Sequence, residues 1–353
     1  MNRLHCSGSV EELNQQKTVA RKIIAGKGFY LDGTSALMLS EIGFLQNIYD
    51  FVPSLRVPQS VISLLLELRD KFEYHPGHSG HLGYAKGRLT FSDLDRSRGE
   101  AIKMNFENSI RLLESKPRNI SAISLANKSS AFSEQKVPAS LSDACILAQK
   151  EGTAVLTEDF LYLKVNEMET KKPAPEYCSS LTLLRVLYEQ KKIPFDDYLE
   201  YFGYLSSYRV RFLPVTSEDM EKAVFGDQTI KVIHPEQLRK FNFPLTLSEE
   251  YGVTPGTAFQ LVVHFFMKVL IDDSVLPSTV ERIFAEIVSL FPTNESRKAL
   301  GRLLLAVAVQ FAQKNRQRLI IGFRVKEKLD TKATFLRAYG PDEPFLLPWP
   351  SSL

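Results

Sequence analysis

The sequence predicts an α/β domain with a parallel sheet flanked by helices, followed by an all-helical C-terminal region. From about Lys27 onward, short apolar runs alternate with segments of helical period, which is typical of such a domain. From about Gln228 onward, strand-like runs are absent and helical periods dominate. With 353 residues the chain is long enough for two ordinary domains. We place their boundary near Gly226, which gives domains at 1–226 and 227–353.

The first elements are short apolar runs that end in turn residues, each followed by a periodic apolar segment. A strand at 28–31 ends at Asp32-Gly33, and Pro58 ends a second strand. Ser60 then precedes the apolar helix VISLLLELRDKF. In order, we expect a strand at 28–31, a helix at 34–45, a strand at 54–57, a helix from 61, one arm of a hairpin at 87–91, and helices at 96–113 and 120–131.

The later elements follow the same logic. A helix at 140–150 ends at Gly152, and the buried strand that follows delivers Glu158 and Asp159 at its C-terminal end. In order, we expect a strand at 153–156, helices at 160–168, 179–190 and 195–205, an edge strand at 208–213, a helix at 218–225, and C-terminal helices at 257–270, 278–291 and 295–315. The tail from Tyr339 contains four prolines and is expected to be an extension on the surface.

Composition is that of an average soluble globular protein, with 44% hydrophobic and 24% charged residues. A net charge of +3 neither demands nor excludes a nucleic-acid partner. Three widely spaced cysteines argue against a disulfide framework and against a zinc site, and Cys145 is expected to be a small buried hydrophobe. The N-terminus has no apolar secretory segment, and no apolar window is suited to a bilayer. We expect a cytoplasmic protein with no membrane partner.

Three aspartates stand where an α/β sheet places its ligands. Asp32 follows the first strand, Asp159 follows the strand at 153–156, and Asp143 lies in the first turn of the preceding helix. Converging carboxylates do not all stay ionised without a cation between them. Mg²⁺ or Mn²⁺ is the natural neutraliser because both ions prefer oxygen ligands.

Each aspartate also has a purely structural interpretation. Asp32 could be a turn residue or the N-cap of the next helix. Asp143 stands three residues after Ser140, which makes a capping box. Asp159 could cap the helix at 160–168. Taken singly, each structural interpretation is favoured about two to one, and only the combination favours a site.

Three sequence blocks together resemble PIN domains. FYLDGTSAL at 29–37 resembles their opening strand and first acid, LSDACILA at 141–148 their Asp-Ala helix, and TAVLTEDF at 153–160 their closing Thr-x-Asp motif. The resemblance covers about residues 28–224, with the blocks in the family's order. It implies a PIN-like Rossmann-type sheet, an acidic cluster that binds Mg²⁺ or Mn²⁺, and cleavage of single-stranded RNA.

The sequence departs from the PIN pattern at the family's glutamate. PIN domains place it in the helix after the second strand, close behind a Pro-x-Ser-Val signal. Here Pro58-Gln-Ser-Val61 is present, but Ser63, Leu64 and Leu65 follow it. The first acid is Glu67, three residues after Leu64, where it could either reach the site or be a solvated surface residue.

The sequence therefore predicts a metal-dependent endoribonuclease that hydrolyses the phosphodiester bonds of single-stranded RNA. Asp32, Asp143 and Asp159 would be the metal ligands, with Glu67 a further catalytic residue, through metal-assisted activation of water. Alternatives are a catalytically inactive PIN-like binding or regulatory module, and a DNA-directed nuclease. A protein inhibitor and a homo-oligomer are possible partners.

Two basic clusters could track a nucleic-acid backbone, or be solvated helix faces. Their members are Lys17, Arg21, Lys22 and Lys27 in the first cluster, and Lys314, Arg316, Arg318, Arg324, Lys326 and Lys328 in the second.

Overall fold

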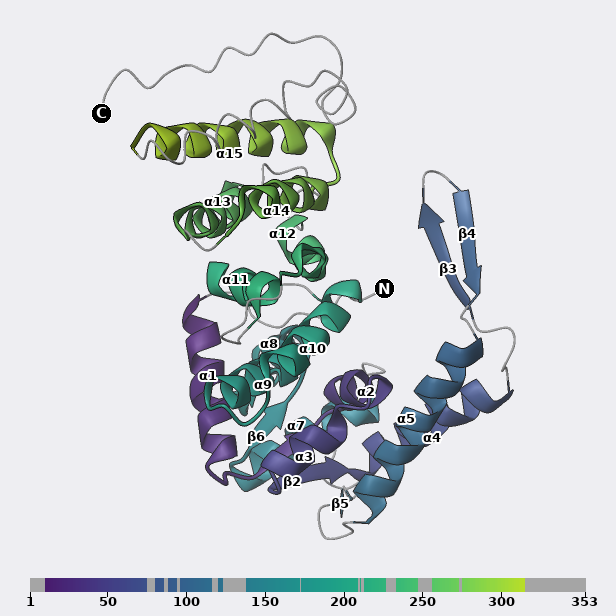
Figure 1. Ribbon diagram of the computed structural model, residues 1–353. Helices are drawn as coiled ribbons and strands as arrows, with labels where there is room; N and C mark the ends of the chain where they lie inside the picture. Colours follow the sequence, from purple (N-terminus) through teal and green to yellow (C-terminus); the bar gives the residue numbers. More distant parts are fainter. Residues whose placement is uncertain are drawn as a thin grey trace. The chain divides into compact units, whose positions relative to one another are not determined.

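A computed structural model gives the fold of the chain (Figure 1). The residues that it describes are 10–74, 80–85, 88–93, 96–115, 120–122, 138–171, 173–208, 210, 213–226, 233–246, 256–272 and 275–314. These residues fall into two compact units. The first is made by residues 1–201 and 210–212, and the second by residues 202–209 and 213–353.

The first unit is built on a five-stranded sheet in which all neighbouring strands are parallel, with the order β5-β2-β1-β6-β7. The expected α/β class with a parallel sheet flanked by helices is therefore confirmed. Its strands are β1 (Phe29–Leu31), β2 (Leu55–Pro58), β5 (Ile120–Ser121), β6 (Ala154–Leu156) and β7 (Glu176–Cys178).

Helices connect the strands, as parallel pairing requires. A separate hairpin is formed by β3 and β4, which pair antiparallel, and this confirms the expected arm near residues 87–91. The other elements up to residue 207 are α1 (Val10–Ile24), α2 (Gly33–Glu41), α3 (Leu45–Phe51), α4 (Gln59–Tyr74), β3 (Gly80–Ala85), β4 (Arg88–Asp93), α5 (Arg96–Glu114), α7 (Ala139–Glu151), α8 (Phe160–Thr170), α9 (Ser180–Glu189) and α10 (Phe195–Ser207).

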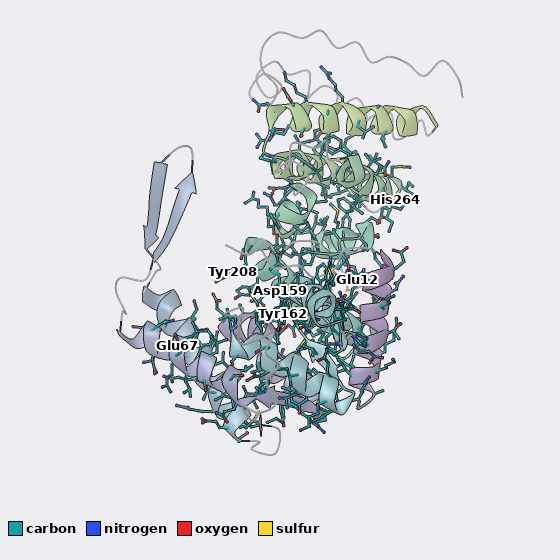
Figure 2. The ribbon with its side chains drawn as sticks, turned by 180° about the vertical axis from the view of Figure 1, so that it is seen from behind. Glu12, Glu67, Asp159, Tyr162, Tyr208 and His264 are labelled. Carbon is teal, nitrogen blue, oxygen red and sulfur yellow. The ribbon has the colours of Figure 1, made fainter. Side chains whose placement is uncertain are left out.

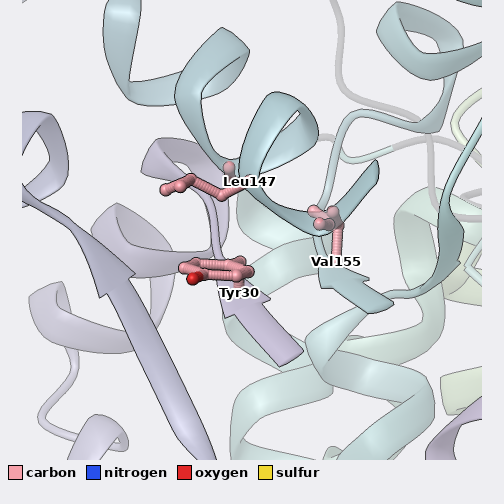
Figure 3. Close-up of a cluster of buried hydrophobic side chains, with 5 residues drawn as sticks. Tyr30, Leu147 and Val155 are labelled. Atoms are coloured by element: carbon pink, nitrogen blue, oxygen red, sulfur yellow. The ribbon is translucent and has the colours of Figure 1, made fainter. Parts of the chain in front are cut away.

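Helix α7 packs against β1, β2 and β6 and forms part of the core of the first unit. Tyr30 and Val155 stand on adjacent strands in paired positions, and small side chains of α7 let the helix approach them closely (Figure 3). All of β1 and β6 is buried. The packing fixes the position of the first turn of α7 relative to the ends of these two strands.

Three expectations about strands were wrong. Ile120–Ser121 is a strand paired with β2, not the start of a helix, because Ile120 is opposite Val57 in the sheet. The rest of that expected helix, 123–131, lies outside the described residues. β7 was not expected at all. Tyr208, Val210 and Leu213 are not in a strand, and the residues between them are partly outside the described part.

The described elements of the second unit, after the end of α10, are all helical. Phe202 and Phe241 pack ring to ring with centroids 5.1 Å apart, and Phe259 contacts Phe291 edge-on. The Pro-rich tail lies outside the described residues. No helix among those described is both long and apolar enough to cross a bilayer. The helices are α11 (Ser217–Phe225), a 3-10 helix η3 (Pro235–Phe241), α12 (Asn242–Thr246), α13 (Gly256–Ile271), α14 (Pro277–Leu290) and α15 (Asn294–Lys314).

Candidate functional site

The order of the strands places the candidate site between β1 and β6. From β1 the chain moves outward to β2 and β5, then returns to β6 on the other side of β1 and continues to β7. Crevices that bind ligands in parallel sheets lie beyond the carboxyl ends of the strands at this reversal. Leu31 and Leu156 end β1 and β6 in register, and the amide of Asp32 donates to the carbonyl of Leu156 at 3.1 Å.

The Asp32 carboxylate is buried and held by hydroxyl and amide groups. Its Oδ1 accepts from the Ser35 amide at 2.8 Å, so Asp32 is the N-cap of α2, as the structural interpretation expected. Thr157 Oγ1 donates to Oδ2 at 2.5 Å, and Thr34 Oγ1 lies 2.8 and 3.0 Å from the two oxygens. The cap therefore does not exclude a site, because two further hydroxyls orient the same carboxylate.

Burial raises the pKa of Asp32 to about 7, and the nearby charge of Glu158 contributes to the rise, while the three hydrogen-bonding residues oppose it. No lysine, arginine or histidine contacts this carboxylate in the part of the chain that the structure describes. A buried carboxylate that lacks a cationic side chain is stabilised in its charged form by a bound cation.

Asp143 lies inside α7 and not at its start. The helix begins at Ala139 with Pro138 as N-cap, and no side chain caps it. The capping box expected between Ser140 and Asp143 is therefore wrong, because both residues are already within the first turns of the helix. Asp143 is 6% exposed and faces the interior.

Asp159 is the N-cap of α8, where its Oδ1 accepts from the amide of Tyr162 at 3.2 Å. The amide of Asp159 in turn donates to Thr157 Oγ1 at 3.0 Å. The capping interpretation of this residue is confirmed, and the same bond places Tyr162 beside it (Figure 2). Asp159 is only partly exposed, so its carboxylate does not extend into free solvent.

The charges of the three predicted aspartates all act on the Tyr162 hydroxyl, which is shielded from solvent. Burial raises the pKa of Tyr162, and the charges of Cys145, Asp32, Asp143 and Asp159 raise it further. The phenol therefore stays neutral while it lies among these acids. Sequence analysis did not identify Tyr162, although its position three residues after an expected cap places it on the face of α8 that carries Asp159.

Glu67 does not lie with the three aspartates. Its side chain is 64% exposed and pairs with Lys71, whose Nζ is 2.7 Å from Oε1 (Figure 2). Leu64 is the residue of α4 that faces the site, since its Cδ2 lies 3.1 Å from where a β-carbon on Gly33 would stand. A residue three positions along a helix points about 60° away from the first residue. Glu67 therefore points away from the direction of Leu64, and its side chain lies in solvent. The expectation that Glu67 could reach the site is corrected accordingly.

Glu158 is a second carboxylate at the reversal, and it was not among the expected site residues. Its side chain is fully buried. Oε1 accepts from the Ser180 amide at 2.8 Å, from the Ser180 hydroxyl, and from Ser35 Oγ at 3.3 Å. β6 ends at Leu156, and beyond it Thr157 bonds Asp32 while the Glu158 carboxylate bonds Ser180 and Ser35.

The donor chemistry fits a hard divalent cation, but the side chains are not gathered into a complete ligand set. All three aspartates supply carboxylate oxygen, and Asp32 has no cationic partner within the described residues. Among those same residues, no three His, Cys, Asp or Glu side chains lie close enough together to hold a metal ion. An ion bound by Asp32, Asp143 and Asp159 together would require that their carboxylates come closer than in this structure.

Three of the four members of the first basic cluster form ion pairs. Lys22 and Lys27 both contact Glu176, at 2.9 and 2.8 Å, and Lys17 contacts Glu189 at 2.6 Å. These pairs tie α1 to β7 and α9, which favours the structural interpretation of the cluster. Within the second cluster, only the backbone of Lys314 is described.

Comparisons with models of protein families, with curated proteins and with solved structures found no match for this chain.

Proposed function

We propose that this protein is a metal-dependent ribonuclease of PIN type, with its site at the reversal between β1 and β6. The observation that carries the proposal is the placement of the three aspartates at the carboxyl ends of β1 and β6: Asp32 follows β1, Asp159 lies three residues after β6, and Asp143 is on α7, which packs against both strands. These residues span 127 positions of the sequence (32 to 159), and parallel α/β proteins bind ligands at this end of the sheet. The choice of RNA rests on the resemblance to PIN domains.

The chain's own groups would divide the work as follows. Asp32, Asp143 and Asp159 would hold Mg²⁺ or Mn²⁺, which when bound activates water and stabilises charge on the phosphate. Thr34 and Thr157 would keep the Asp32 carboxylate oriented, since their hydroxyls already contact it. Glu67 has no catalytic role in this proposal, because its side chain is in solvent.

The test is calorimetric titration of Mn²⁺ into wild-type protein and into Asp143→Asn, followed by incubation of both with single-stranded RNA and DNA oligonucleotides. We expect wild type to bind Mn²⁺ and cut RNA, and the variant to lose at least tenfold in both. Asp50→Asn is the matched control, since Asp50 is an exposed aspartate on α3. Cleavage of RNA that persists in EDTA, or equal activity of Asp143→Asn, would contradict the proposal. Preferential cleavage of DNA would contradict the proposed RNA substrate and support the proposed metal site.

A second candidate is a PIN-like module that binds RNA or a protein without cutting it. Two observations favour it: Glu67 is in solvent, and the apolar Leu64 faces the site in its place. This module would show no heat of Mn²⁺ binding and no cleavage, while retaining its fold. The same titration therefore separates the two functions.

A further inference from the structure

We propose that Glu158 is a positioning residue of this site, which holds Ser35 and through it the Asp32 carboxylate; the inference rests on the proposed function. The influence of Glu158 on Asp32 passes through α2, whose first turn carries Ser35. The following contacts support this role.

Ser35 is bonded to both carboxylates at once. Its backbone amide donates to Asp32 Oδ1 at 2.8 Å, and its hydroxyl donates to Glu158 Oε1 at 3.3 Å. The residue is fully buried, so water does not compete for either bond. A hydroxyl bonded to an ionisable acid is restrained in rotation, and its amide is restrained with it.

A second connection runs through the backbone of Glu158. Its amide donates to Thr34 Oγ1 at 3.1 Å, and that oxygen lies 2.8 Å from Asp32 Oδ1. The turn after β6 is therefore joined to the first turn of α2 at two neighbouring residues. Glu158 is thus connected to both residues of α2 that bond the Asp32 carboxylate.

Glu158 is itself anchored from the opposite side. The amide and hydroxyl of Ser180, the first residue of α9, both donate to Oε1, and the Ser180 hydroxyl also bonds the buried hydroxyl of Tyr201. The start of a helix is a favourable place for a carboxylate, because its free amides and dipole both attract negative charge. A carboxylate held this firmly can serve as a fixed support for Ser35.

A purely structural role for Glu158 would make the same contacts, so stability alone does not separate the two roles. The two roles differ in what happens to the metal when the Ser35 connection is cut. Residues that orient metal ligands typically change metal affinity 10- to 100-fold when altered. A residue that only supports α9 would change unfolding and leave the affinity of correctly folded protein as it was.

The experiment compares Mn²⁺ dissociation constants, measured by calorimetry at one pH, for wild type, Ser35→Ala, Glu158→Gln and the double variant. Glu158→Gln preserves size and removes the negative charge that strengthens the bonds from Ser35 and Ser180, and circular dichroism checks each variant. We expect each single change to weaken Mn²⁺ binding about tenfold and the double change to add little more, because both act on one connection. Tyr201→Phe is the control, since it removes a buried hydroxyl one bond further away, and its affinity should stay within about twofold of wild type.

If wild type binds Mn²⁺ and the folded Ser35→Ala and Glu158→Gln variants bind it with the same affinity, the positioning role of Glu158 is overturned and the proposed function is not. Fully additive losses in the double variant would also overturn the positioning role, because they show independent effects. A wild-type protein that binds no Mn²⁺ contradicts the proposed function, and the positioning role falls with it.

Discussion

Thr157, Glu158 and Asp159 follow one another directly after β6, yet their side chains bond three different elements. Thr157 donates to Asp32, Glu158 accepts from Ser180 at the first turn of α9, and Asp159 caps α8. Three adjacent residues can therefore orient a carboxylate, anchor a neighbouring helix and fix the start of the next one.

The raised pKa of Asp32 predicts how stability depends on pH in metal-free protein. Between pH of about 4 and about 7 the folded state keeps a proton on Asp32 that the unfolded chain releases. The free energy of unfolding should therefore fall as pH rises through this window, by at most on the order of 4 kcal/mol. Asp32→Asn should remove this fall and unfold at higher denaturant concentration than wild type at pH 8.

The measurement is urea unfolding in EDTA at several pH values from 4.5 to 8 for wild type and Asp32→Asn. Asp50→Asn serves as the comparison, because it makes the same chemical change at an exposed position of α3. Parallel curves for wild type and Asp32→Asn would show that the Asp32 carboxyl ionises equally in the folded and unfolded states, against this prediction.

The elements that were predicted well are those whose pattern is long or sharply ended. α7 was expected at 140–150 and runs over Ala139–Glu151, ended by Gly152 with a left-handed φ of 64°. By contrast, β5 and β7 have two and three residues. No period can be read in so few residues, and both strands exist because a neighbouring strand offers its free edge.

The same distinction between local sequence pattern and packing applies to the candidate site. Asp32 and Asp159 could be placed from the sequence because each comes after a strand and opens a helix, and Cys145 is buried as its apolar stretch indicated. The expectation for Glu67 failed because packing alone determines which face of α4 points toward the site. In the structure that face carries Leu64, which lies near Gly33. Glu158 was overlooked because its burial depends on α9, whose position relative to β6 no local pattern specifies.

Helix α1 is fastened to α9 by a buried amide, and this contact predicts a stability effect. Gln16 is 1% exposed, and its Oε1 accepts from the Ser179 amide and from Thr182 Oγ1, both at 3.1 Å. Gln16→Ala would leave the buried Ser179 amide without this acceptor, at a cost of about 1–3 kcal/mol. Gln15→Ala, at the exposed neighbouring position, should change the free energy of unfolding by less than about 0.5 kcal/mol. Chemical unfolding of both variants measures the difference, and equal effects would show that the buried amide contributes nothing specific.

At the scale of the whole chain, the two compact units divide within α10, after Tyr201, with residues 210–212 returning to the first unit. The change in composition that suggested a boundary near Gly226 reflects the end of strand-like sequence. Contacts instead group α11 with the helices that follow it, through η3 and α13. Composition reports which elements a segment forms, whereas a compact unit depends on which elements pack together, so the two boundaries measure different properties.

This division predicts where a bound metal ion would stabilise the molecule. A ligand that binds only the folded state adds about 2.7 kcal/mol at a concentration 100 times its dissociation constant, and the gain appears in the elements that unfold to release it. All three aspartates belong to the first unit. Mn²⁺ should therefore slow amide hydrogen exchange in α2, α7 and α8, and leave α13 and α14 unchanged.

Hydrogen-exchange mass spectrometry with and without Mn²⁺ measures this directly, and Asp143→Asn provides the protein in which the effect should disappear. Protection of α13 and α14 alone would place the ion in the second unit, away from the aspartates. Equal protection of both units would mean that they unfold together, since an ion held by one unit can protect the other only through a shared opening step.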